Sequence, residues 1–413
     1  MFMEEELAAD IKNSLIEKLE FKEDVSDEEL KEMIGEEIKE LNSRFHIPIK
    51  NRLELGKQIY HSMRKLDILQ DLLEDPGITE IMVNGPDNIF IERKGKLERI
   101  PQGFESEDSL RNVIDQIVAK CNRVVNDSSP IVDARLMDGS RVNVVLNPVA
   151  INGPILTIRR FPAKPFLMED LIRIGSLTEE VSAFLKDLVV SGYNIIVSGG
   201  TGSGKTTFLN ALSAFIPSDE RIITIEDSAE LQIQGIDNLV RMETKNSNIE
   251  GNNPITIRDL IRTSLRMRPN RIIVGEVRGG EAMDMVCSAM NCGHDGSMST
   301  VHANSAKDTI SRLETMILMA VELPIHAIRR QIGSGVDIIV HLGRMRDRSR
   351  RVLEIAELRN SADGEIDVNP LFTFMETEDS TKERVAGRLQ KTGRLKNEEK
   401  LKNAGIHISN ESD

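Results

Sequence analysis

A glycine-rich stretch near the middle of the chain has the residue types and spacing of a phosphate-binding loop. Residues 199–207 read GGTGSGKTT, which fits the pattern GxxxxGK[ST]. An apolar run, NIIVS, precedes it at 194–198, and a helix-forming run follows at 208–215. Glycines allow the backbone to wrap closely around an anion, so that successive amide N–H groups and the positive end of the helix converge on a phosphate. The sequence therefore predicts a nucleotide site in a strand, loop and helix arrangement.

The side chains of this stretch have separate expected tasks. Lys205 reaches the β- and γ-phosphate oxygens, the Thr206 hydroxyl ligates Mg²⁺, and Thr207 supports the α-phosphate. The expected nucleotide-binding residues are Gly199, Gly200, Thr201, Gly202, Ser203, Gly204, Lys205, Thr206 and Thr207.

Acidic residues follow two predicted strands and are candidates for activating water and polarising the metal ion. The strand at 222–226 ends in Glu226 and leads to Glu230, while the strand at 271–274 leads to Glu276. In a parallel sheet both strands end at the edge that carries the phosphate loop. We expect Glu276 to act on Mg²⁺ through a bound water, and either Glu226 or Glu230 to position the attacking water.

Two histidines, His294 and His302, flank a predicted strand at 298–301 in the run NCGHDGSMSTVHANS. An imidazole close to a γ-phosphate can sense the leaving group, and we expect this of His294, while a purely structural role stays open for His302. A zinc site needs third and fourth ligands, and only Cys292 is nearby, so zinc is not expected.

Apolar periodicity and breaks divide the chain into five expected segments. Residues 1–75 form an acidic helical region, and residues 76–160 a mixed α/β domain. Residues 161–175 contain two closely spaced prolines and are expected to be a linker. In residues 176–372 strands alternate with helices, which predicts a parallel sheet covered by helices. Residues 373–413 are polar and lysine-rich and are expected to form a tail.

Composition restricts the class of function. The chain has 413 residues and a net charge of −14, of which the first 40 residues carry −10, and this sign argues against a surface built to hold nucleic acid. Aromatic residues make up 3% with no Trp, which argues against base stacking. The three cysteines, Cys121, Cys287 and Cys292, cannot make a disulfide framework and are expected to be reduced. No apolar run approaches the roughly 18 residues of a membrane span, and the start lacks signal-peptide features, so a cytoplasmic location is expected.

The order of the motifs resembles that of the secretion ATPase superfamily. GGTGSGKTT is followed by ITIEDSAEL, RPNRIIVGEVRGGEA and GHDGSMSTVHAN, after an earlier TEIMVNGPDNIFIERKGKLE. The chain most resembles the CpaF-like ATPases of Tad or Flp pilus systems. The resemblance implies an α/β fold: a RecA-like P-loop ATPase domain preceded by a smaller α/β (PAS-like) domain and an N-terminal helical region. It also implies ATP hydrolysis with Mg²⁺, a homohexameric ring, and inner-membrane platform proteins as partners that hold the ring at the cytoplasmic membrane.

The resemblance also implies roles for single residues. The matching segments are 201–207 for the Walker A loop, 226–230 for the Asp box, 275–276 for the Walker B site, and His294 with His302 for the His box. The family places its catalytic glutamate at the position of Glu230. It also sets arginines of the preceding domain against the nucleotide, and the candidates here are Arg159 or Arg160, with Arg141 and Arg135 less firmly matched.

Other functions stay open beside this one. A DNA-translocating ATPase of the conjugative kind would use the basic run 344–351, although Asp347 and Arg348 between apolar strands indicate a solvated hairpin turn. A nucleotide-binding switch without turnover would leave the acidic residues and histidines with no catalytic task. The chain lacks the tetracysteine zinc insert of many relatives, and Ser228 stands where retraction ATPases often have proline.

Overall fold

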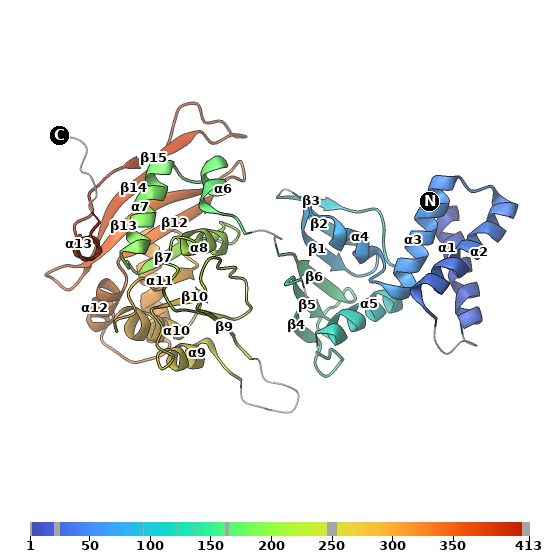
Figure 1. Cartoon of the computed structure of the whole chain (residues 1–413), viewed down its shortest axis with the longest axis horizontal. Helices are drawn as coiled ribbons and strands as arrows, with labels where there is room; N and C mark the ends of the chain where they lie inside the picture. Colours follow the sequence, from blue (N-terminus) through green and yellow to red (C-terminus); the bar gives the residue numbers. More distant parts are fainter. Residues whose placement is uncertain are drawn as a thin grey trace. The chain divides into compact units, whose positions relative to one another are not determined.

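The computed structural model describes residues 2–19, 25–93, 95–121, 123–136, 138–161, 165–245 and 254–406. The chain divides into two compact units, Met1–Pro162 and Ala163–Asp413 (Figure 1). Among the helices within these described ranges, none is both long enough and apolar enough to cross a membrane.

The first unit begins with four helices, α1 (Phe2–Leu19), α2 (Asp27–Phe45), α3 (Ile49–Arg64) and α4 (Ile68–Glu74). Helix α2 starts with a capping box, because the Ser26 hydroxyl accepts from the Glu29 N–H and the Glu29 carboxylate accepts from the Ser26 N–H. Apolar side chains spaced three and four residues apart pack α1, α2 and α3 together. This small core contains Ile11, Leu15, Leu30, Ile34, Ile38, Leu55 and Ile59.

A six-stranded antiparallel sheet and one long helix make up the rest of the first unit. The elements are β1 (Ile78–Asn84), β2 (Ile89–Arg93), β3 (Lys96–Arg99), α5 (Glu107–Lys120), β4 (Ile131–Arg135), β5 (Arg141–Val145) and β6 (Ile155–Arg159). The strand order is β3-β2-β1-β6-β5-β4, so β6 lies in the middle of the sheet between β1 and β5. The apolar face of α5 packs on this sheet, which gives the smaller α/β domain its own core.

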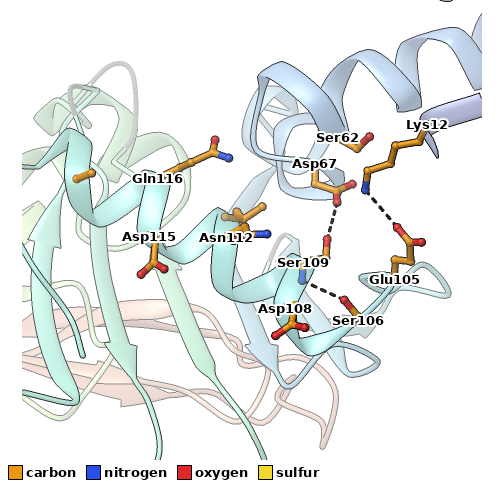
Figure 2. A pocket seen from close by; sticks show the side chains of 12 residues that line it. Lys12, Ser62, Asp67, Glu105, Ser106, Asp108, Ser109, Asn112, Asp115 and Gln116 are labelled. Atoms are coloured by element: carbon orange, nitrogen blue, oxygen red, sulfur yellow. Dashed lines mark hydrogen bonds and ion pairs between the residues drawn. The ribbon is translucent and has the colours of Figure 1, made fainter. Parts of the chain in front are cut away.

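Polar contacts join the helical region to α5 (Figure 2). Lys12 of α1 pairs with Glu105 at 3.2 Å, and the Ser109 hydroxyl donates to the Asp67 carboxylate at 3.3 Å. These residues line a cavity of about 670 Å³. Burial raises the pKa of Asp67, so the junction holds a carboxyl group that water stabilises poorly.

A nine-stranded sheet forms the centre of the second unit. Its elements are α6 (Met168–Arg173), α7 (Glu179–Val190), β7 (Ile195–Gly199), α8 (Lys205–Ser213), β8 (Ile222–Glu226), β9 (Leu239–Glu243), α9 (Ile257–Ser264), β10 (Arg271–Val277), α10 (Glu281–Met283), the π-helical η1 (Asp284–Met290), β11 (Met298–Val301), α11 (Ala306–Leu318), α12 (Ile325–Gly335), β12 (Ile338–Arg344), β13 (Arg350–Asn360), β14 (Ile366–Glu376), β15 (Gly387–Lys391) and α13 (Glu399–Asn403). The strand order is β15-β14-β13-β12-β7-β11-β10-β8-β9. The strands from β12 to β9 in that order are parallel, and β13, β14 and β15 are antiparallel additions.

Helices cover both faces of this sheet (Figure 1). Because side chains alternate along a strand, Ile195 and Val197 of β7 face one core while Ile196 faces the other. The first core also takes in α7 and α8, and the second takes in η1, α11 and α12. The expected arrangement, a parallel sheet covered by helices and preceded by a smaller α/β domain, is the observed one.

Two expected segments differ from the structure. The expected linker at 161–175 contains α6, whose Met168 and Leu171 are buried in the first core of the second unit, while its residues 162–164 lie outside the described residues. The expected tail at 373–413 continues the sheet through β15 and packs α13 on the same core, while its residues 407–413 lie outside the described residues. A few apolar residues suffice in both segments because they join a core that already exists. Leu389, Leu395 and Leu401 serve this purpose near the carboxyl end.

Candidate active site

The predicted phosphate loop joins β7 to α8 at the edge where the parallel strands end. Two of its glycines are required by the surrounding structure. A Cβ on Gly199 would lie 2.5 Å from the carbonyl oxygen of Leu342 on the neighbouring strand, closer than atoms can approach. Gly204 caps α8 with φ of 92°, a conformation that strains other residues. The backbone can therefore turn sharply enough to aim the first N–H groups of α8 at an anion.

Lys205 is held at the start of α8 by neighbouring polar atoms. Its side chain is 8% exposed, and its Nζ donates to the carbonyl oxygen of Gly200 at 3.3 Å. The same Nζ lies 3.2 Å from Nδ1 of His302, which follows the adjacent strand β11. A buried ammonium group supported in this way is positioned for phosphate oxygens before any ligand arrives.

His302 links Lys205 to Glu276, which lies in β10. Its Nε2 is 2.8 Å from the Glu276 carboxylate, whose other oxygen pairs with Arg278 at 2.6 Å. Burial lowers the pKa of His302, and the positive charges of Lys205 and Arg278 lower it further against the opposing effect of Glu276. The imidazole is therefore neutral near pH 7. Since an ammonium group can only donate, the His302 ring accepts from Lys205, whose Nζ lies 3.2 Å from Nδ1 and 3.4 Å from Nε2.

Glu226 and Glu230 lie together after β8 but have different surroundings. Glu226 is 3% exposed, and one of its carboxylate oxygens accepts from the N–H groups of Glu230 at 2.6 Å and Leu231 at 2.8 Å. Burial raises the pKa of Glu226 to about 7, although these two hydrogen bonds oppose the change. Glu226 thus shapes the loop that carries Glu230. Of the two residues expected to position water, the geometry favours Glu230.

His294 is not brought together with the other expected site residues in this chain. It precedes β11, whereas His302 follows it, so the two histidines lie at opposite ends of one strand. The His294 Nδ1 is 3.2 Å from the carbonyl oxygen of Pro269, which precedes β10. The expectation that His294 senses the leaving group is therefore corrected: within this chain His302 is the histidine at the phosphate loop.

The candidate arginines all lie in the first unit, on β4, β5 and at the end of β6. Arg159 is opposite Arg141, and Arg141 is opposite Arg135, so three cationic side chains form one row across the sheet. Like charges in such cross-strand pairs repel, which favours an anion near them. Arg159 lies 3.6 Å from Glu80 but keeps 61% of its side chain exposed.

Arg160 has a different environment from Arg159. Its guanidinium donates to the carbonyl oxygens of Asp75 and Ile78, the second at 3.2 Å, and so joins β6 to the segment before β1. A side chain committed to its own domain in this way has fewer donors left for a ligand. The structure therefore favours Arg159 of the two.

Arg350 is a site residue that the sequence reasoning did not identify. Its Nε donates to the carbonyl oxygen of Gly202 in the phosphate loop at 2.9 Å. Arg344, directly opposite across the β12–β13 hairpin, lies beside the same glycine. The expected solvated hairpin turn therefore places two arginines against the phosphate loop. The sequence did contain one signal for this contact: Arg344 and Arg350 stand at the two ends of a hairpin turn, directly after a buried strand.

The residues present fit ATP with Mg²⁺. Magnesium in nucleotide sites keeps several waters and takes ligands from the phosphates, so one or two protein groups suffice. Thr206, in the first turn of α8, would supply one ligand, Glu276 would hold the metal through a bound water, and the amides around Gly204 would hold the phosphates. Among the described residues, no group of three or more His, Cys, Asp or Glu side chains could hold a metal ion, so no zinc cluster is found there.

Comparisons with known proteins extend these observations. The profile of the family described as "Type II/IV secretion system protein" matches residues 63–409. A putative conjugal transfer protein of Mycobacterium tuberculosis is 35% identical over 300 residues, which covers 71% of this chain and 84% of the relative. The type IV secretion system protein VirB11 of Brucella suis is 36% identical over 307 residues, with 67% and 84% covered. The solved structure of the pilus retraction motor PilT with bound ADP has a TM-score of 0.51 at 22% identity over 74% of this chain and 82% of that one, a likeness of fold. The chain belongs to the type II/IV secretion system protein family.

Proposed function

We propose that this chain hydrolyses ATP with Mg²⁺ and drives pilus assembly or secretion as a cytoplasmic, ring-forming motor of the CpaF-like branch. The observation that carries the proposal is the line of contacts from the phosphate loop through Lys205 and His302 to Glu276. If His302 only stabilised the fold, it would not need a contact with the buried ammonium group of Lys205. A nucleotide site needs a cation for the phosphates and an acid near the metal, and this line supplies both.

Each residue in the site has a task in the proposed reaction. The amides before α8 and Lys205 hold the β- and γ-phosphates, while Glu230 orients a water molecule toward the γ-phosphorus. The water oxygen forms a bond to the γ-phosphorus as the bond from that phosphorus to the bridging oxygen breaks, the bridging oxygen leaves with ADP, and the proton that the water loses leaves with the released phosphate. His302, which lies between Lys205 and Glu276, responds to the loss of the γ-phosphate through Lys205. Bound Mg²⁺ supplies charge neutralisation, and Thr206 with Glu276 would hold it.

The motor function needs the first unit to respond to the nucleotide. The row of Arg159, Arg141 and Arg135 supports this role, because mutually repelling cations favour a phosphate between them. An arginine supplied from a separate domain can raise the rate by about 10³ to 10⁵. We propose that Arg159 leads this contact, within a homohexamer that acts on inner-membrane platform proteins and is held at the membrane by them.

Steady-state hydrolysis and nucleotide binding test the proposal together. The purified chain should release phosphate from ATP, while Lys205→Ala and Glu230→Gln should both lose turnover. Glu230→Gln should still bind a fluorescent ATP analogue, since its side chain acts on water. Lys186→Ala, an exposed lysine of α7, is the matched control and should keep full activity. Hydrolysis that survives in Lys205→Ala would refute the site, and nucleotide binding without any turnover would instead favour a switch.

A second function, DNA transfer, is favoured by one observation: the relative in Mycobacterium tuberculosis is named a putative conjugal transfer protein. A DNA-translocating ATPase would hydrolyse ATP faster in the presence of DNA, most clearly at low salt. A rate that DNA does not change at low salt removes this candidate and leaves the pilus or secretion motor.

A further inference from the structure

A groove on the N-terminal helices is separate from the nucleotide site and lies between α2 and α3. Its volume is about 910 Å³, and its lining residues are Lys31, Ile34, Gly35, Ile38, Lys39, Ile49, Arg52, Leu53, Gly56, Lys57, Tyr60 and His61. All of them precede residue 63, where the match to the family profile begins. The groove therefore lies outside the residues that match the family profile.

The floor of this groove is apolar and open. Ile49 and Leu53, one turn apart on α3, leave 69% and 73% of their surfaces exposed. Each of the two helices has a glycine in the groove, Gly35 on α2 and Gly56 on α3, and the missing side chains leave the groove open. A Cβ on Gly35 would meet nothing within 4 Å. Exposed leucine and isoleucine beside a glycine-lined depression form a surface that a helix can cover.

The rim of the groove is positive in a strongly negative region. Helix α2 carries seven acidic residues, yet no acidic residue lines the groove, whereas Lys31 and Lys39 do. Lys57 pairs with Asp71, and Lys31 lies 4.8 Å from the centre of the Tyr60 ring.

Within the described residues, two cations on the rim have neither an acidic partner nor a contact with an aromatic ring. Lys39 and Arg52 make no ion pair with any carboxylate in the described part of the chain. The Arg52 Nε is buried and has no hydrogen-bond partner there. A buried donor without an acceptor is costly, and an acidic ligand would supply the acceptor.

We propose that this groove binds an amphipathic helix of a partner protein, whose apolar face enters between α2 and α3 and whose flanking Asp and Glu residues pair with Lys39 and Arg52. The charge around the groove distinguishes an acidic helix of a protein from an anionic lipid surface as the ligand. An anionic lipid surface would meet the seven acidic residues of α2 and the −10 net charge of the first 40 residues, and would be repelled. A narrow acidic helix meets only the positive rim.

Binding of a designed peptide to the full-length protein tests the proposal. The probe is a fluorescein-labelled helical peptide of 18 residues with Leu at positions i, i+3, i+4 and i+7 and Glu beside them. It should bind with a micromolar dissociation constant and weaken in high salt. Leu53→Glu and Arg52→Glu should each weaken binding at least tenfold. Lys50→Glu, an exposed site of α3 that does not line the groove, makes the same charge change and should leave binding unchanged.

A third variant keeps the test independent of folding. Gly35→Leu places a good helix former where there is open space, so it should preserve the fold while filling the groove and abolishing peptide binding. Equal binding by all variants, or no binding by the wild-type chain, would overturn the proposal. Binding to phosphatidylserine vesicles in place of the peptide would overturn it in favour of a membrane, and self-association lost in these variants would overturn it in favour of a second copy. The Lys205→Ala variant should bind the peptide normally, which separates this proposal from the proposed ATPase function.

Discussion

Replacing the buried carboxyl group of Glu226 with an amide should stabilise the second unit in a pH-dependent manner. Burial raises the pKa of Glu226 from its ordinary 4.5 to about 7. Well below pH 4.5 the Glu226 carboxyl is protonated in both the folded and the unfolded state, so it makes no pH-dependent contribution to stability there. As the pH rises toward 7 the unfolded chain ionises first, and the folded state loses stability. The full loss above pH 7 is about 3 kcal/mol, at 1.36 kcal/mol per pKa unit.

Glu226→Gln removes this loss while keeping the loop in place, because the amide oxygen can still accept from the N–H groups of Glu230 and Leu231. At 2 to 4 °C per kcal/mol for a body of this size, the variant should melt roughly 6 to 12 °C above wild type at pH 8. The difference should almost vanish at pH 4.5. Differential scanning calorimetry across this range is the assay, with the exposed Glu243→Gln on the neighbouring strand as control. An equal shift at both pH values, or a wild type that is the more stable at pH 8, would refute the reasoning.

Three further substitutions test the site and its support. Gly199→Ala should abolish ATP binding in equilibrium dialysis, because its Cβ would lie 2.5 Å from the carbonyl oxygen of Leu342; tight binding by the variant would contradict this. Arg350→Ala should raise the dissociation constant for ATP about tenfold by freeing the phosphate loop, and Arg348→Ala, a cation of the same hairpin, should not; equal effects would point to net charge alone. Tyr193→Phe should lower the free energy of unfolding by about 1 kcal/mol in urea titrations, since it removes a buried hydrogen bond of 2.6 Å; an unchanged midpoint would show that water replaces it.

The phosphate loop and its supporting strands could be predicted because their signals are local. GGTGSGKTT specifies a turn with glycine at the two positions, Gly199 and Gly204, where the structure requires it, and the apolar runs around it have the lengths of strands and helices. The position of Glu276 followed from one further rule, that parallel strands end at the same edge. These inferences need only the order of the elements along the chain.

Other features depended on strand order, which local signals do not contain. Arg350 meets the phosphate loop because β12 pairs with β7, and no local pattern states that pairing. The sequence analysis assigned the sensing role to His294, and only the direction of β11 shows that His302 is the histidine beside the phosphate loop. The carboxyl-terminal segment looked polar because its few apolar residues, such as Leu401, complete a core built mostly from other parts of the chain.

The strands that pair with β7 lie far along the chain, and this affects how the protein folds while it is being translated. Ile195 of β7 pairs with Met298 and Ile338, more than a hundred residues later along the chain. During synthesis both hydrogen-bonding edges of this apolar strand therefore wait for partners that the ribosome has not yet produced. Long-range pairing of this kind is slow and leaves edges open to other chains. The strand that leads into the predicted phosphate loop is thus one that stays unpaired for a long part of translation.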